Sequence, residues 1–173
     1  MVIRVSEIPD EGLQVEGVEA FPHPFLDSSW ALEQVSLHIS KNNGGKVLVR
    51  GRLVTCVPQV CGRCLEAFTV RVAPEVGTRF LPNPLGRWDE DQELTADDLE
   101  LDFYVGDLLD LDRLIQTEVM LGLPMKPLCC EECRGLCPVC GGNRNSHPCA
   151  CEARLPDPRL AALKTIGARM FSR

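Results

Sequence analysis

Residues Cys129 to Cys151 read CCEECRGLCPVCGGNRNSHPCAC, and this stretch decides how the end of the chain folds. It holds seven of the ten cysteines of the 173-residue chain and is nearly devoid of aliphatic side chains. A segment of this composition cannot bury enough apolar surface to fold by itself. The cysteines must therefore supply what an apolar core would otherwise provide.

The expected cellular compartment limits the chemistry that these cysteines can perform. The first residues, MVIRVSE, lack the charged-then-apolar pattern of an export signal, and no apolar run reaches the roughly 18 residues of a membrane helix. We therefore expect a cytoplasmic protein without membrane contact. Reducing conditions in the cytosol favour metal binding or thiol chemistry over disulfides.

Four thiols within the quoted stretch have the spacing of a zinc ribbon. The first pair encloses Pro138, which pre-sets a tight turn, and is followed by Gly141, which permits a positive φ. A second pair begins nine residues later. Zinc prefers four tetrahedral ligands, so the four thiols predict a closed structural site with no position for water. The predicted ligands are Cys137, Cys140, Cys149 and Cys151.

A possible second zinc site joins the quoted stretch to an upstream pair, Cys61 and Cys64. We predict Cys129 and Cys133 as the partners of this pair, with Cys130 as the substitute for Cys129. Metal held there would contribute folding free energy by linking segments distant in sequence. The alternatives are a reduced, buried pair at Cys61 and Cys64, or a six-cysteine cluster in which Cys133 serves the ribbon.

Two further side chains could have entered these sites. His147 lies inside the ribbon and could replace a cysteine, but enough thiols are present without it. Cys56 has apolar neighbours at a strand end and is interpreted as a small buried side chain.

The residues before Cys129 read as an α+β domain with an antiparallel sheet. Apolar and polar residues alternate in residues 35–40, 68–72 and 99–105, which predicts half-buried strands. Residues 46–56 form another strand that leads into the Cys61–Cys64 pair, so the pair is expected at the tip of an antiparallel hairpin.

The strand at residues 46–56 contains an irregularity. Val47 and Val49 fall out of phase with Val54 and Cys56, and Gly51 lies between them. This pattern predicts a β-bulge at Gly51.

From Asp110 the period becomes helical and predicts one amphipathic helix covering a face of the sheet. Asp107 or Asp110 can cap its start, and Gly122 and Pro124 end it. Its apolar stripe comprises Leu111, Leu114, Ile115, Val119 and Leu121.

Three segments follow from these patterns: an α+β domain over residues 1–128, a zinc-ribbon appendage over 129–155, and a C-terminal amphipathic helix over 156–173. The last helix is short and basic. It either lies back on the domain or docks on RNA or a protein partner.

The net charge of −7 argues against general binding to nucleic acid, which depends on lysine and arginine. However, eleven of the 25 acids lie between Asp89 and Asp112 without a single base. This segment could pair with a basic protein that would otherwise bind RNA non-specifically.

Several segments of the sequence resemble the YceD family, in the branch that carries a metal-binding tail. They are VPQVCGRCLE at 57–66, DLDRLIQTE at 110–118 running into LGLP at 121–124, and the cysteine tail with DPRLAAL at 157–163. The resemblance covers roughly residues 30 to 170, and residues 144–148 depart from the commoner form of the tail.

The resemblance implies a role in large ribosomal subunit biogenesis, through accumulation of ribosomal RNA. The partner is then ribosomal RNA or a large-subunit ribosomal protein, with no small-molecule substrate. We expect no enzymatic activity, because a zinc ion with four thiolates has no free position to activate water. The alternatives are a zinc-ribbon module that binds nucleic acid and, less favoured, a thiol redox protein using Cys61 and Cys64.

Overall fold

The computed structural model describes residues 1–42, 44–83 and 101–151. The chain divides into two compact units. The first unit comprises Met1–Gln59 and Ala67–Pro127, and the second comprises Val60–Glu66 and Leu128–Arg173. The loop that carries Cys61 and Cys64 therefore belongs with the cysteine-rich tail, although both flanking strands continue from the first unit. The predicted C-terminal helix at 156–173 lies outside the described residues.

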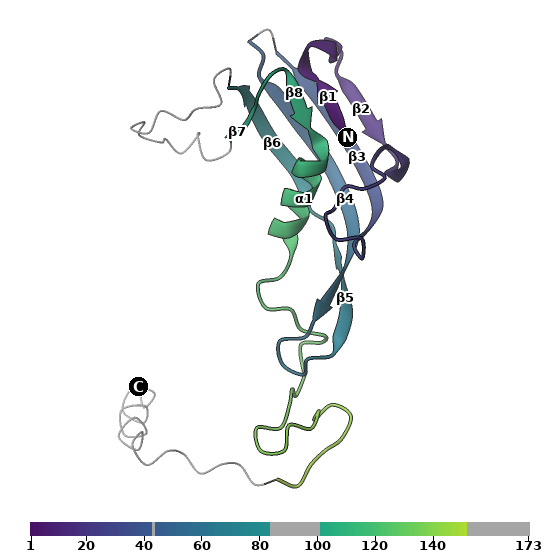
Figure 1. The fold of residues 1–173 in the computed structure, drawn as a ribbon, viewed down its shortest axis with the longest axis vertical. Helices are drawn as coiled ribbons and strands as arrows, with labels where there is room; N and C mark the ends of the chain where they lie inside the picture. Colours follow the sequence, from purple (N-terminus) through teal and green to yellow (C-terminus); the bar gives the residue numbers. More distant parts are fainter. Residues whose placement is uncertain (43, 84–100, 152–173) are drawn as a thin grey trace, which may run out of the picture. The chain divides into compact units, whose positions relative to one another are not determined.

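The first unit is built on a six-stranded sheet (Figure 1). Its strands follow the order β2-β3-β4-β6-β7, and β5 pairs with β4. Their bounds are β2 Leu13–Glu16, β3 Ala31–Lys41, β4 Val47–Val60, β5 Ala67–Val72, β6 Glu75–Pro82 and β7 Leu101–Tyr104. The unit is thus α+β, as the sequence predicts.

The expectation of a wholly antiparallel sheet is wrong, because β6 and β7 pair in parallel. Antiparallel neighbours need only a tight turn, whereas parallel neighbours need a crossover of a dozen or more residues. The chain between Pro82 and Leu101 supplies that length. The pairs β2–β3, β3–β4 and β4–β6 are antiparallel.

The predicted bulge at Gly51 is also wrong. The core face of β4 runs in one phase through Val49, Gly51 and Leu53, and the register with β3 and β6 is unbroken there. Gly51 is present because a Cβ atom would lie 2.0 Å from the carbonyl oxygen of Ser36. The register shift lies in β3 instead, between Leu32 and Gln34.

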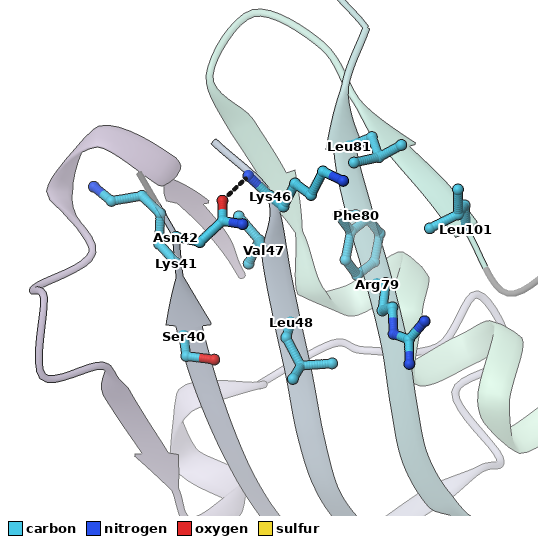
Figure 2. Close-up of a pocket in the computed structure, with 10 residues that line it drawn as sticks. All are labelled: Ser40, Lys41, Asn42, Lys46, Val47, Leu48, Arg79, Phe80, Leu81 and Leu101. Atoms are coloured by element: carbon cyan, nitrogen blue, oxygen red, sulfur yellow. Dashed lines mark hydrogen bonds between the residues drawn. The ribbon is translucent and has the colours of Figure 1, made fainter. Parts of the chain in front are cut away.

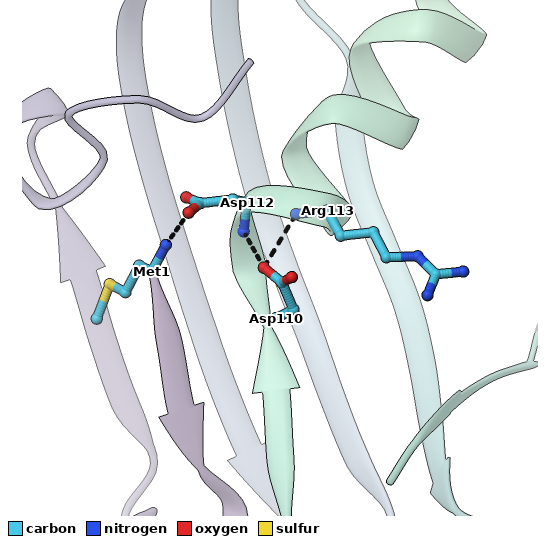
Figure 3. A network of polar contacts seen from close by, with 4 residues as sticks. All are labelled: Met1, Asp110, Asp112 and Arg113. Carbon is cyan, nitrogen blue, oxygen red and sulfur yellow. Dashed lines mark hydrogen bonds and ion pairs between the residues drawn. The ribbon is translucent and has the colours of Figure 1, made fainter. Parts of the chain in front are cut away.

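One α-helix, α1 (Leu111–Gly122), lies over the sheet. The side chain of Asp110 caps it by accepting hydrogen bonds from the backbone amides of Asp112 and Arg113, at 3.0 and 3.2 Å (Figure 3). The amino group of Met1 also pairs with the Asp112 carboxylate. Four of the five stripe residues are buried, but Leu121 is 77% exposed because the last turn no longer faces the core.

A two-stranded sheet and two short 3₁₀ helices complete the described part of the first unit. The strands β1 (Val2–Arg4) and β8 (Leu108–Asp110) pair antiparallel, and the 3₁₀ helices are Val5–Glu7 and Val18–Ala20. Together with α1, the β1–β8 pair lies on one face of the main sheet. The apolar core between these layers includes Leu37, Ile39, Leu53, Leu109 and Ile115.

The second unit contains no described helix or long strand apart from the end of β4. Its described residues form turns and one isolated antiparallel bridge, between Leu136 and Asn143. Its buried side chains, within the described residues, are Cys61, Cys64, Cys133 and Cys137. Across the described parts of both units, no helix is long and apolar enough to cross a membrane.

Candidate metal centres

The eight predicted cysteines form two groups of four in the second unit. In each group the four sulfur atoms lie within 4.8 Å of one another. The first group is Cys61, Cys64, Cys129 and Cys133, and the second is Cys137, Cys140, Cys149 and Cys151. These are the two sets that the spacing predicts. That they hold metal stays a prediction.

The first group has the dimensions of a tetrahedral thiolate site. The Sγ atoms of Cys61 and Cys133 are 3.8 Å apart, and those of Cys64 and Cys129 are 3.6 Å apart. A tetrahedral ion with metal–sulfur bonds of about 2.3 Å places its sulfur atoms about 3.8 Å apart. These two separations therefore match those expected around a four-coordinate metal ion.

The backbone of the Cys61–Glu66 loop turns both of its thiols toward the same point. The Cys61 amide donates to the carbonyl of Glu66, and the Leu65 amide donates to the carbonyl of Cys61, each at 2.9 Å. Leu65 takes a positive φ of 61°, which a non-glycine residue adopts only when the surroundings compensate. The tight turn thus brings Cys61 and Cys64 onto one side.

Arg63 connects this loop to the segment of the downstream cysteines through hydrogen bonds. Its guanidinium group donates to the carbonyl oxygens of Glu131 and Cys133, both at 3.0 Å. Its own carbonyl accepts the amide of Leu136 at 3.0 Å. A Cβ on Gly135 would lie 2.9 Å from that carbonyl, and the φ of Gly135 is +67°, so a side chain is excluded there.

Asn145 holds a ligand sulfur from outside the first group. Its side-chain amide nitrogen donates to the sulfur of Cys133 at 3.3 Å, while its side-chain oxygen accepts the amide of Arg134 at 2.8 Å. Nearby, Asn143 accepts the Asn145 amide and donates to the carboxylate of Glu66. Groups that orient a ligand in this way strengthen metal binding.

The second group is built around a turn of the kind that the sequence predicts. The Gly141 amide donates to the carbonyl of Cys137 at 2.9 Å, and the Cys137 amide donates to the carbonyl of Gly142 at 2.8 Å. The Val139 amide points at the sulfur of Cys137 at 3.4 Å. Gly141 has a φ of +74°, which confirms the positive φ expected after the second cysteine.

The thiols of each group differ in acidity. Backbone amides of Cys129 and Cys64 lower the pKa of Cys61 to about 6, and amides of Cys140 and Val139 lower the pKa of Cys137 to about 6. Conversely, neighbouring sulfurs, Cys133 first, raise the pKa of Cys129. One thiolate in each group, at Cys61 and at Cys137, is thus favoured, while the full set of four needs a cation to balance its charge.

The other candidate side chains lie outside both groups. The sulfur of Cys130 is exposed and 4.0 Å from that of Cys129, so Cys129 and not its substitute completes the first group. His147 contacts Ser146 and is absent from both groups. Cys56 is only half-buried and donates to Glu33 at 3.0 Å, so its interpretation as a buried side chain is wrong.

Sequence reasoning did not assign Arg63, Gly135 and Asn145 to the site. Cysteine spacing identifies ligands, but these residues act through hydrogen bonds and close contacts that depend on how the loops fold. The one available signal was composition: two asparagines and several glycines stand between the cysteine pairs, where turns need them.

The structure thus defines a protein with an α+β unit and a second unit containing two four-thiol groups suited to metal. The chain belongs to the family described as Large ribosomal RNA subunit accumulation protein YceD, whose match spans residues 49–167. It is also 33% identical, over 133 residues, to uncharacterized proteins of Mycobacterium bovis and of two strains of Mycobacterium tuberculosis. The aligned region is 77% of this chain and 61% of each relative. No solved structure matches the chain.

Proposed function

We propose that this protein is a cytoplasmic, non-catalytic factor for large ribosomal subunit biogenesis, and that it binds two zinc ions through its two four-thiol groups. The family match carries the ribosomal part of this proposal, because the family is described by accumulation of large ribosomal RNA. The gathering of eight cysteines into two groups of four carries the metal part.

The donor set supports zinc as the metal. Four thiolates in tetrahedral array select zinc or iron over harder cations. The backbone amide of Val139 donates to the Cys137 sulfur and the side-chain amide of Asn145 donates to the Cys133 sulfur, as expected around a closed structural site. Zinc would give the second unit the folding free energy that its few buried side chains cannot supply.

The absence of catalysis is part of the proposal and is supported by how the thiols are placed. Each group provides four sulfur ligands, which leaves no coordination position for a water molecule. A thioredoxin-type dithiol needs its first cysteine at the start of a helix. Here Cys61 follows a strand and enters a turn, and the Arg63 guanidinium is engaged by two carbonyl oxygens.

The partner is proposed to be large-subunit ribosomal RNA, with a ribosomal protein of that subunit as the alternative. Direct binding to RNA requires a locally basic surface on a chain whose net charge is −7. The main sheet of the first unit offers such a surface around the exposed side chains of Lys46 and Arg50.

Depletion of the protein in cells tests the ribosomal role. We expect large-subunit ribosomal RNA to fall relative to small-subunit RNA, and free large subunits to decline in sedimentation profiles. Normal RNA ratios and normal subunits after depletion would refute the proposal.

Rescue of the depleted cells links that role to the metal groups. The wild-type chain and the matched Cys130→Ser variant should restore the RNA, because Cys130 lies outside both groups. Cys133→Ser should restore little or none, and the purified variant should hold one zinc ion instead of two. Full rescue by a variant that has lost this zinc would separate the metal from the function.

A further inference from the structure

The face of the main sheet opposite α1 carries side chains that are mostly exposed within the described residues. Cross-strand pairing arranges the residues of this face in rows. One row contains Glu16, Ser36, Arg52 and Glu75. The next contains Gln14, His38, Arg50 and Gly77, and the one after contains Ser40, Leu48, Arg79 and Leu101.

The first of these rows is acidic, and its charged side chains pair or hydrogen-bond with neighbouring residues of the same face. Arg52 pairs with Glu75 at 3.1 Å. Glu16 accepts hydrogen bonds from the side chains of Gln14 and Ser36, at 2.7 and 3.4 Å. With Glu19 and Glu33, these carboxylates line one concavity of the sheet. An anionic partner would be repelled from this end.

The next two rows contain Arg50 and Arg79 and no carboxylate, and Lys46 directly precedes β4. We call His38, Lys46, Arg50 and Arg79 the basic face. Lys46 and Arg79 of this face line a groove of about 730 Å³ together with Lys41 (Figure 2). Its other walls include Leu48, Leu81 and Ser40. No acidic side chain is among its described lining residues.

Two cations of the basic face are available to a ligand. Arg50 and Lys46 are exposed, and neither side chain has an ion pair or hydrogen bond within the described residues. Lys41 differs, because its ammonium group donates to the carbonyls of Val5 and Ser6. Nothing lies within 4 Å of the Cβ position of Gly77, the residue paired with Arg50, so the surface beside that arginine is open.

We propose that the basic face binds the sugar–phosphate backbone of RNA. Lysine and arginine side chains on one open surface neutralise phosphates, and the partly buried Leu48 and Leu81 offer apolar contact to riboses. Because the whole chain is acidic, the attraction must be local, and the acidic row confines the RNA to one end of the sheet. This inference rests on the proposed role in ribosomal RNA accumulation and adds the surface that contacts the RNA.

Binding of a fluorescein-labelled RNA hairpin to the full zinc-loaded chain tests this proposal by fluorescence anisotropy. The double variant Lys46→Gln, Arg50→Gln should bind at least about tenfold more weakly. The slope of log affinity against log salt should fall by about 1.4 to 1.8, because each of the two phosphate contacts contributes a slope of about 0.7 to 0.9.

The matched control is Arg52→Gln. It removes one positive charge from the same strand and face, two residues from Arg50, but from the acidic row where Arg52 is paired with Glu75. RNA affinity should change less than twofold. Circular dichroism of each variant should match the wild-type chain, because the three substituted side chains are exposed.

Four results would overturn the proposal. They are no RNA binding by the wild-type chain, equal weakening by Arg52→Gln and by the double variant, tighter binding to duplex DNA than to the RNA hairpin, or binding only after the acids at 89–100 are neutralised. If the RNA-binding experiment fails but depletion still lowers ribosomal RNA, only the RNA-binding role of the basic face is refuted and the biogenesis role is retained. Normal ribosomal RNA on depletion would instead refute the role itself.

Discussion

The two units of this protein bury different kinds of side chain. The core of the first unit consists of aliphatic and aromatic residues between a sheet and the layer formed by α1 and the β1–β8 pair. In the second unit, the buried side chains of the described residues are all thiols. The comparison teaches that apolar burial can stabilise the first unit, whereas the second unit buries thiols that could hold a metal ion.

Metal removal should have the largest effect, because it should unfold the second unit and leave the first unit folded. Structural zinc sites contribute about 10 to 16 kcal/mol of apparent binding free energy, which is folding free energy where no apolar core exists. With a chelator, we expect amide exchange protection to vanish in residues 128–151 and to persist in β3 and β4 up to Leu53. Hydrogen-exchange mass spectrometry measures this.

The control for that experiment is the same chelator saturated with zinc, which should leave both regions protected. Protection that survives in the second unit after complete metal loss would show that its turns are stable without coordination.

A cavity in the apolar core should affect only the first unit. Leu53 is fully buried, so Leu53→Ala should lower the free energy of unfolding by about 2 to 5 kcal/mol without loss of zinc. Its neighbour Val54, half-buried on the opposite face, provides the matched Val54→Ala variant with a smaller loss. Urea denaturation and metal analysis together measure both quantities. A larger effect at Val54 would contradict the phase of β4.

Loss of the Asn145 side-chain amide should weaken zinc binding by the first group without abolishing it. Asn145→Ala removes a donor to the Cys133 sulfur and should lower zinc affinity about 10- to 100-fold at unchanged stoichiometry. Competition with a chromophoric chelator measures the affinity. His147→Ala, in the same segment but outside both groups, should leave it unchanged. Equal losses would show that the segment as a whole, and not the amide, matters.

The smallest expected effect concerns the cap of α1. Asp110→Ala removes the acceptor for two backbone amides and should destabilise the first unit by about 0.5 to 2 kcal/mol. Asp10→Ala changes an exposed turn residue whose side chain has no hydrogen bond within the described chain, and should be neutral. Thermal unfolding followed by circular dichroism at 222 nm, the usual helix wavelength, compares the two. A neutral Asp110→Ala would mean that α1 is held by packing alone.

The sequence predicts the features that depend on nearby residues. The helix, its cap and the turn at Cys137–Gly141 follow from short-range periodicity and from side chains that bond their own backbone. The strands at 35–40, 46–56 and 68–72 lie within β3, β4 and β5, apart from a one-residue difference at the start of β4.

What the sequence did not predict depends on distant segments. The parallel pairing of β6 with β7 and the phase of β4 through Gly51 are set by neighbours that come from elsewhere in the chain. The strands β1 and β8 span three residues each, too few for a period to be recognised. Likewise, Leu121 fits the helical stripe, but periodicity does not indicate where the core ends.

The two pairs of thiols in the first group are synthesised at different times. Cys64 and Cys129 are 65 residues apart, and translation at about 5 to 20 residues per second separates their synthesis by roughly 3 to 13 seconds. During that interval Cys61 and Cys64 lack the other two thiols of their group, while β5, β6 and α1 are still being made. If this group binds metal as proposed, its four thiols are complete only after every described strand of the first unit has been synthesised.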